Sequence, residues 1–359
     1  MKVVMTLLVR DEADIVDEQI AFHLDAGVDF VIATDNRSQD GTTDILERYE
    51  REGRLHLIKE PGDDLRQSEW VTRMARLAAT EFDADWVLNT DADEFWWPQG
   101  AGLGEVLAAI PARYGVVRAA WRNFVPRPDD GRSFSERMTA RLRTPAFHHH
   151  PLSTHSKSAH RAVPDVRIGR GNHEAFGEGL LPLRGWYPLE ILHFPVRSLE
   201  HSVRKYVTQF VALERNTEKG IPNHMAEAHK AYRAGGLEQF YEPLVVDDDA
   251  LARGLEDGSL ALDTRLRERL RALGFGNSAD PQAAEVRSSN SLLQGASSDF
   301  GRLDVAAAAE FAAESSALEE SDFALALGAR IEELETRVGR LERGAWKRVG
   351  RVVRRGMRR

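Results

Sequence analysis

Short apolar runs alternate with amphipathic stretches along roughly the first hundred residues of the chain. The apolar runs have the length and the β-branched content of strands buried on both faces of a parallel sheet. They cover residues 3–9, 30–33, 55–58 and 86–89. The stretches between them predict helices over residues 14–26, 42–52 and 68–80, with Ser68 as the N-cap of the last. This alternation predicts an α/β fold in which helices flank a mostly parallel sheet.

The pattern is less regular after residue 100. A strand is predicted over residues 116–121, a short apolar run covers 189–192, and a helix is predicted over 198–214. Residues 147–160 are rich in histidine and are predicted to form a loop. We therefore expect the α/β domain to span residues 1–215 and a C-terminal helical extension to span 216–275.

Two segments of different character are predicted after the helical extension. Residues 276–322 are rich in Ser, Ala and Asp and are predicted to be a flexible linker. Residues 323–359 are predicted to form a short coiled coil that ends in a basic tail. Its apolar positions recur at alternating steps of four and three residues, at Leu327, Ile331, Leu334, Val338 and Leu341. Such a seam would allow a homo-oligomer, either a dimer or a trimer.

The composition excludes several classes of protein. The chain has no cysteine, so disulfides, thiolate nucleophiles and cysteine-ligated zinc are excluded, and a reducing cytoplasm fits. The net charge of −9 gives no general attraction to nucleic acid. No run approaches the roughly 18 apolar residues of a membrane span. The first apolar run is interrupted by Arg10, Asp11 and Glu12, so it is predicted to be a strand and not a targeting peptide.

The charge is distributed unevenly along the chain. Residues 343–359 contain eight Lys or Arg residues and no acidic residue, with Trp346 and several valines among them. Such a tail could bind the anionic inner face of a membrane, which would suit an enzyme that acts on lipid-linked glycans. A solvated terminus and a contact with another acidic macromolecule are the alternatives.

Three polar clusters directly follow predicted strands. They are Arg10-Asp11-Glu12 after the first strand, Asp35-Asn36-Arg37-Ser38 after the second, and Asp91-Ala92-Asp93-Glu94 after the fourth. Ligands in open α/β sheets bind beyond the carboxyl ends of the strands. We therefore expect the three clusters to meet at one edge of the sheet.

Asp91 and Asp93 are the strongest candidates for the functional site of the chain. Two carboxylates this close at the end of a buried strand repel each other, and burial increases the cost. A divalent cation, Mn²⁺ or Mg²⁺, would neutralise them and could also bind a diphosphate. A solvated loop, or a cluster that caps a helix, is the alternative explanation.

These residues resemble a known family. The apolar strand with Arg10-Asp11-Glu12, the segment ATDNRSQDGT over 33–42 and the segment DADEFWWP over 91–98 are together similar to the family 2 glycosyltransferases of the GT-A fold. The similarity is to the bacterial branch with an RNE-x-D motif and a D-x-DEF motif. The chain departs from the commonest family pattern at Asn36-Arg37, where Asp-Gly is usual. The resemblance implies a GT-A-like sheet and a nucleotide-sugar donor.

The resemblance also implies roles for the individual residues in donor binding. Asp35 would lie near the base or ribose, although an Asx-turn is the alternative for it, and Glu12 would lie at the same end of the pocket. Asp91 would contact the ribose or a metal-bound water, and Asp93 would ligate the metal. A basic residue that approaches the donor is expected at Arg73, with Arg66 as the alternative for the same role.

A histidine further along the chain would complete the metal site. The segment Gly171-Asn172-His173-Glu174 resembles the small-residue-then-His motif of these enzymes, so His173 is the first candidate and His193 the second. A loop position for His173 and a core position for His193 are the alternatives. The catalytic base of an inverting reaction would be Glu94 or Glu174, and the sequence does not choose between them.

Two further features have open interpretations. The run His148-His149-His150, with His155 and His160 nearby, could suggest zinc, but Pro145 and Pro151 interrupt any helix-borne pair of ligands. Trp96-Trp97 could stack on an acceptor sugar, or could pack in the core with one ring partly exposed.

The expected function is transfer of a hexosyl group from a UDP-, GDP- or dTDP-sugar to a glycan or cell-surface polysaccharide precursor, with Mn²⁺ or Mg²⁺. A sugar-nucleotide nucleotidyltransferase usually has a Gly-rich loop after the first strand, whereas the first glycine here is Gly27. A non-catalytic nucleotide-binding scaffold would more often have lost one of the motif carboxylates, and all of them are present.

Overall fold

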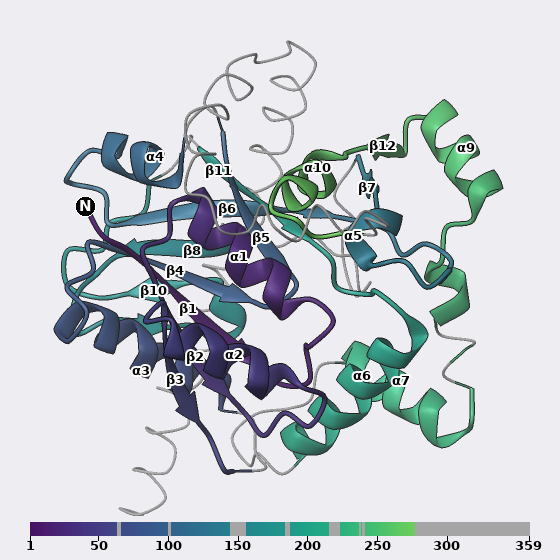
Figure 1. Ribbon diagram of the computed structural model, residues 1–359, viewed down its shortest axis with the longest axis horizontal. Coiled ribbons are helices and arrows are strands. Elements are labelled where there is room, and N and C mark those ends of the chain that lie inside the picture. Colours follow the sequence, from purple (N-terminus) through teal and green to yellow (C-terminus); the bar gives the residue numbers. More distant parts are fainter. Residues whose placement is uncertain are drawn as a thin grey trace, which may run out of the picture. The chain divides into compact units, whose positions relative to one another are not determined.

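The computed structural model describes residues 1–62, 66–99, 102–143, 156–183, 187–214, 223–236, 238 and 241–276 (Figure 1). All of these belong to one compact unit, Met1–Asp304. The predicted linker over 276–322, apart from its first residue, and the predicted coiled coil and basic tail over 323–359 lie outside the described residues. In the described part of the chain, no helix is both long and apolar enough to cross a membrane.

An eight-stranded sheet forms the centre of the unit, with strand order β3-β2-β1-β4-β8-β6-β11-β5. Its strands are β1 (Val3–Val9), β2 (Phe30–Asp35), β3 (Leu55–Lys59), β4 (Trp86–Asp91), β5 (Glu94–Pro98), β6 (Val116–Asn123), β8 (Ser156–Arg161) and β11 (Leu189–His193). The pairs β1–β2, β2–β3, β1–β4 and β6–β11 are parallel, whereas β8 and β5 pair antiparallel with their neighbours. The predicted α/β class with a mostly parallel sheet is therefore confirmed.

Helices cover both faces of this sheet (Figure 1). The larger helices of the first half are α1 (Val16–Ala26), α2 (Thr42–Arg51), α3 (Gln67–Thr80) and α4 (Leu103–Ala109). Met5 and Leu7 of β1 pack in one core with residues of α1, α2 and α4, whereas Val4 packs in a second core with Val71 and Met74 of α3. Because alternate residues of a strand face opposite sides, the unbroken apolar run of β1 serves both cores.

The remaining elements are short or lie after residue 130. They are α5 (Phe134–Arg137), β7 (Ala140–Leu142), β9 (Arg167–Ile168), η1 (Arg170–Asn172), β10 (Ala175–Phe176), α6 (Leu199–Glu214), α7 (Asn223–Arg233), η2 (Glu242–Leu244), α9 (Asp248–Glu256), β12 (Leu260–Leu262) and α10 (Arg265–Ala272). Strand β12 pairs with β7, and Arg271 of α10 pairs with Glu136 of α5. The end of the predicted helical extension is thus attached to the α/β part of the chain.

Two local predictions were wrong. The histidine-rich stretch predicted as a loop ends in β8, which fills the gap between β4 and β6. Its sequence SKSAHR lacks the usual strand pattern because several of its buried residues are polar, among them Lys157 and Ser158. Ser68 is also not an N-cap, because α3 begins one residue earlier at Gln67, with Arg66 in the capping position and no side-chain cap.

A buried histidine joins the first helix to the far edge of the sheet. His23 of α1 is fully buried, and its Nδ1 lies 2.7 Å from the Gln19 carbonyl oxygen. Its Nε2 accepts a hydrogen bond of 3.1 Å from the Trp96 backbone N–H of β5. These two partners fit only the neutral ring with the proton on Nδ1. Burial lowers the pKa of His23 to about 4, and the bond to Gln19 opposes this only in part.

This pKa predicts a loss of stability in acid. The unfolded chain binds a proton at His23 as the pH falls below its ordinary pKa of 6.5, whereas the folded chain does not until about 4. The free energy of unfolding should therefore fall across that window, by about 2 kcal/mol at pH 5 from this group alone. His23→Gln keeps an acceptor for Trp96 and does not titrate. Its loss of stability between pH 7 and pH 5, measured by urea unfolding, should be smaller by about that amount. Equal losses in both proteins would contradict a neutral buried ring.

Candidate functional site

The three predicted polar clusters meet where strands β2, β1 and β4 end side by side. In the sheet register, Val9 of β1 pairs with Asp35, and Leu8 pairs with Asp91. Glu12 follows three residues after Val9, and its backbone N–H donates a hydrogen bond of 2.9 Å to the Thr42 hydroxyl, at the start of α2. The parallel pairing therefore brings carboxylates from three separate chain segments to one edge of the sheet.

The turn between β4 and β5 carries Asp91, Asp93 and Glu94. Antiparallel pairing of β5 with β11 places Glu94 opposite His193. The backbone N–H of Phe194 donates a bond of 2.9 Å to the Asp93 carbonyl oxygen, which fixes the turn against the end of β11. As a result, His193 Nε2 lies 3.8 Å from Asp93 Oδ1. Both side chains are buried.

Asp93, Glu94 and His193 form a group that could hold a metal ion. One ligand atom from each lies within 4.8 Å of the other two, and all three residues are buried. Two carboxylates and an imidazole are donors that suit Mn²⁺ well. Two residues outside this group hold the His193 ring in its orientation. Its Nδ1 lies 2.7 Å from Asn123 Oδ1, and its ring stacks on Trp121 with 4.0 Å between the ring centroids. A partner on the far nitrogen is usual for a histidine that ligates a metal.

Each aspartate of the turn also forms an ion pair with a lysine. Lys205 of α6 places its ammonium 2.5 Å from Asp93 Oδ2, the carboxylate oxygen that is not the one near His193. Burial would raise the pKa of Asp93, but the positive charge of Lys205, with contributions from His193 and Arg197, outweighs it and holds the pKa well below its usual value. Asp93 is therefore ionised at any physiological pH.

Lys157 of β8 serves the other two carboxylates. Its ammonium lies 2.5 Å from Asp91 Oδ2 and 3.1 Å from Glu94 Oε1, and its side chain is only 1% exposed. Burial would lower the pKa of Lys157, but Asp91 and Glu94 raise it to about 12. Burial raises the pKa of Glu94 to about 8, and Asp91 and Asp93 add to this against the opposing charge of Lys157. The other oxygen of Glu94 accepts a hydrogen bond of 3.0 Å from the Asp91 backbone N–H, so the Glu94 side chain is bonded to the backbone of the turn that carries it.

The segment that contains His173 approaches Asp91 through its neighbour. Asn172 Nδ2 donates to Asp91 Oδ1 at 3.2 Å, and Gln67 Nε2 donates to the same oxygen at 3.4 Å. Asn172 adopts a left-handed backbone with φ 61°, next to Gly171 at φ 70°. A tight turn of this kind directs the Asn172 side chain inward. His173 Nδ1 bonds the Ser156 carbonyl oxygen at 2.7 Å, and its ring lies edge-on to Trp121 at 5.9 Å.

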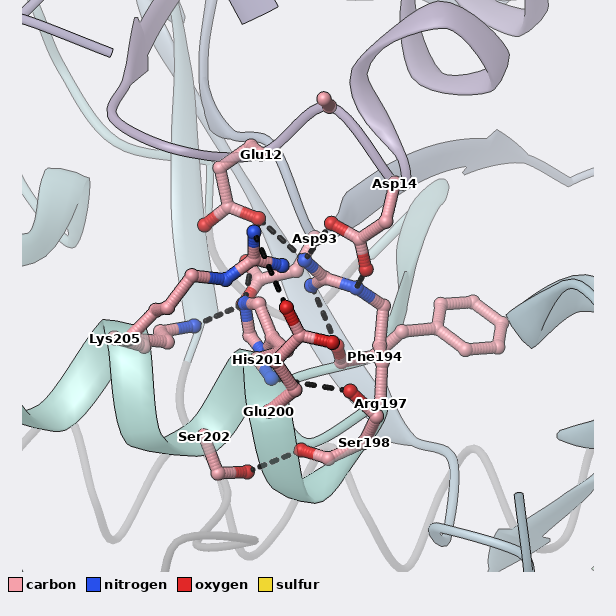
Figure 2. A network of polar contacts seen from close by, with 12 residues as sticks. Glu12, Asp14, Asp93, Phe194, Arg197, Ser198, Glu200, His201, Ser202 and Lys205 are labelled. Carbon is pink, nitrogen blue, oxygen red and sulfur yellow. Dashed lines mark hydrogen bonds and ion pairs between the residues drawn. The ribbon is translucent and has the colours of Figure 1, made fainter. Parts of the chain in front are cut away.

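Glu12 belongs to a second charged cluster, which Figure 2 shows together with Asp93 and Lys205. Arg197, just before α6, donates to both oxygens of Asp14 at 2.8 and 2.9 Å and also to Glu12. His201 Nε2 lies 3.4 Å from Glu12 Oε2. Burial would raise the pKa values of Glu12 and Asp14, but Arg197 outweighs it and holds both below their usual values. Arg197 therefore ties the loop after β1 to the start of α6.

The other predicted donor-binding residues lie around the same edge or on α3. Asp35 is buried, and its two oxygens accept bonds from the Ser38 backbone at 3.0 Å and from the Thr43 hydroxyl at 2.5 Å. The bond to Ser38 reaches three residues along the chain, one more than an Asx-turn would, but it holds the Asp35 carboxylate locally in the same way. Arg73 pairs with Glu60 at 2.5 Å, and Arg66 is exposed, with Glu69 at 3.8 Å.

The remaining candidates are placed as follows. Glu174 is half-buried. Both rings of Trp96 and Trp97 are buried in the core, so the structure favours packing over a sugar platform. In the histidine-rich stretch, residues 148–150 and 155 lie outside the described residues. His160 is buried, and its Nδ1 lies 2.9 Å from the Arg161 carbonyl oxygen.

Sequence reasoning missed three charged residues of this site. Arg197, His201 and Lys205 recur every four residues at the start of the predicted helix over 198–214, a spacing that would place them on one side of it if the helix began at Arg197. In the structure α6 begins at Leu199, so His201 and Lys205 lie on it and Arg197 directly precedes it. That spacing is a signal that could have been used. Lys157 has no such signal, because it stands in a short polar strand that does not look like one.

The charges around Asp91 predict a specific effect on stability. Lys157→Met should lower the free energy of unfolding by about 3 kcal/mol, because it leaves the buried Glu94 and the partly buried Asp91 without their counter-ion. Urea unfolding would measure this loss. Arg132→Met removes the cation of the exposed Arg132–Asp130 pair and serves as the control, with little expected change. The double variant Lys157→Met/Asp91→Asn should lose less than Lys157→Met alone. A double variant that is less stable than the single one would contradict the pairing.

Comparisons with known proteins point to sugar transfer. Residues 4–122 match the model of glycosyltransferase family 92, and this segment contains Glu12, Asp35, Asp91 and Asp93. The match supports a transferase enzyme. It names family 92 where the sequence motifs resembled family 2, so the family 2 assignment stays a prediction. No curated protein matched the chain.

Several solved structures are similar to parts of the chain. TarS from S. aureus in complex with UDP-GlcNAc is 16% identical over 37% of this chain and 36% of its own, with a TM-score of 0.26. The same protein in complex with UDP is 13% identical over 65% and 72%, with a TM-score of 0.30. Glucosyl-3-phosphoglycerate synthase from Mycobacterium tuberculosis, in complex with Mn²⁺, UDP and glucosyl-3-phosphoglycerate, is 18% identical over 34% and 44%, with a TM-score of 0.25.

This chain thus spans 36% of the length of the first of these structures. At TM-scores of 0.30 and below, none of the three defines the fold, which rests on the strand order and register described above. Residues 4–122 of this chain are similar in sequence to glycosyltransferase family 92.

Proposed function

We propose that the chain is a metal-dependent glycosyltransferase that takes a hexosyl group from a nucleotide-sugar donor. The observation that supports this most is the sheet edge itself, where Asp35 and Asp91 end strands on the two sides of β1 and Asp93 follows beside His193. Such an edge is the usual ligand-binding position in an α/β sheet. The match of residues 4–122 to a glycosyltransferase family adds support from the sequence.

The donor would lie across the ends of β2, β1 and β4. Asp35 would contact the base or the ribose, and its bonds to Ser38 and Thr43 hold the carboxylate in one orientation. Glu12 would lie at the same end of the pocket. Asp91 would face the ribose or the water shell of the metal. Arg73, or Arg66 in its place, is the proposed basic residue on the donor side.

Asp93 and His193 would hold the divalent cation, Mn²⁺ or Mg²⁺, with Glu94 in the same group. Asp91 and His173 are the other candidates for this role. The ion, when bound, would neutralise negative charge on the departing diphosphate. Asn123 and Trp121 would keep the His193 ring in its orientation whether or not the ion is bound.

The reaction would be a displacement at the anomeric carbon of the donor. The acceptor oxygen would bond to that carbon while the bond from the carbon to the diphosphate oxygen breaks, and the acceptor proton would pass to a carboxylate. Of the two predicted bases, we favour Glu174 because of the state of Glu94. Glu94 is enclosed in its own turn, and its pKa of about 8 leaves it mostly protonated at neutral pH, whereas Glu174 is only half-buried.

A glycan or lipid-linked glycan is the proposed acceptor, as the resemblance to glycosyltransferases of cell-surface polysaccharides implies. The basic tail and the coiled coil lie outside the described part of the chain. Membrane contact through residues 343–359 and a homo-oligomer formed by the coiled coil therefore stay predictions. A cytoplasmic location is also a prediction.

Thermal-shift screening tests this proposal directly. The purified protein would be heated with UDP, GDP, dTDP or CDP, each with and without Mn²⁺. One nucleotide should stabilise the protein only when Mn²⁺ is present, by about 2.7 kcal/mol at 100 times its dissociation constant. Asp93→Asn should abolish this stabilisation, because the variant loses a charged ligand for the metal.

Asp44→Asn, an exposed position on α2, is the matched control and should respond like the wild type. Metal-dependent stabilisation that survives in Asp93→Asn would overturn the assignment of the metal site. No response of the wild type to any nucleotide would favour a non-catalytic scaffold.

A further inference from the structure

Lys205 occupies an unusual position beside the candidate metal ligands. Its ammonium contacts one oxygen of Asp93 at 2.5 Å, while His193 approaches the other oxygen at 3.8 Å. Asp93 belongs to the group that could hold a divalent cation, and it is also paired with the positively charged Lys205. The two cations would compete for the charge of Asp93, and they would repel each other in a site largely shielded from water.

The two lysines of the site differ in their freedom to move. Lys157 is 1% exposed and is held between Asp91 and Glu94, whereas Lys205 is 21% exposed and has Asp93 as its ion-pair partner. Four rotatable bonds in a partly exposed side chain let the Lys205 ammonium move several ångströms at small cost. The start of α6 does not need to move with it, because Arg197 binds Asp14 and Glu12 on the loop after β1 (Figure 2).

We propose that Lys205 makes the binding of the divalent cation conditional on the binding of the donor. Without the donor, the ammonium neutralises Asp93 and lowers its affinity for the metal. The donor brings a diphosphate whose negative charges attract both cations, so the repulsion between them no longer opposes the metal. Because coupling between two ligands is reciprocal, the metal must tighten donor binding by the same factor. This inference rests on the proposed function.

The test measures Mn²⁺ binding by the full-length chain, using the electron paramagnetic resonance signal of free Mn²⁺. In the absence of nucleotide, Lys205→Gln should bind Mn²⁺ at least tenfold more tightly than the wild type, because the competing charge is gone. Lys205→Arg keeps that charge and should stay within about threefold of the wild type. Arg132→Gln, which removes a cation from the exposed pair with Asp130, should bind Mn²⁺ as the wild type does.

The second arm repeats the titration with whichever of UDP, GDP, dTDP and CDP stabilises the wild type. The factor by which that nucleotide tightens Mn²⁺ binding should be smaller in Lys205→Gln than in the wild type. Lys205→Met is measured in parallel, so that a folding defect of one neutral variant does not decide the result, and circular dichroism confirms that each variant is folded.

Two results would overturn the inference, and they can be told apart. If the wild type shows metal-dependent nucleotide binding but both neutral variants bind Mn²⁺ no more tightly than it does, Lys205 is not a competitor and the proposed function stands. If neither the wild type nor any variant binds Mn²⁺, with or without nucleotide, the proposed function fails and the inference fails with it.

Discussion

The site depends on the cost of holding several carboxylates together at the end of a buried sheet. Asp91, Asp93 and Glu94 follow one another within four residues, and Glu12 is nearby in the charged cluster of Arg197. Carboxylates this close repel each other, and burial makes each charge more expensive. The fold meets this cost with cations from distant parts of the chain, Lys157 from β8 and Lys205 from α6. Through these pairs, β8 and α6 contact the acidic turn of residues 91–94, although both elements are far from it in the sequence.

The same electrostatics divides the carboxylates into different states. Lys205 keeps Asp93 ionised with a lowered pKa, whereas burial and the neighbouring acids raise the pKa of Glu94 to about 8. Adjacent residues of one turn therefore have opposite tendencies. Groups whose environments push their pKa values apart are suited to different tasks, one as a charged ligand and the other as a neutral hydrogen-bonding group.

Two buried histidines complete the framework. His23 connects α1 to β5 because its Nε2 accepts the Trp96 N–H bond, which only the uncharged ring can do, while its Nδ1 bonds Gln19 within α1. His193 is held by Asn123 and Trp121 at the end of β11, where its Nε2 faces Asp93. The first histidine has a structural role in the core, and the second is placed where a metal ligand would be needed. Burial alone does not distinguish the two, but the carboxylates beside His193 do.

Local sequence determined β1, β2, β3, β4, β6 and β11, the helices α1, α2, α3 and α6, and the acidic turn, because apolar periodicity and β-branched runs act over a few residues. The register that aligns Asp35 and Asp91 with the end of β1 follows from parallel pairing of those runs. The strand β8 and the partners Lys157, Lys205 and Arg197 could not be predicted in the same way. Their partners lie 66, 112 and 185 residues away in the sequence, and even the four-residue spacing of Arg197 and Lys205 does not say which carboxylates they meet. Only the tertiary structure decided which cation meets which carboxylate, and it placed His193 beside Asp93 because β5 pairs with β11.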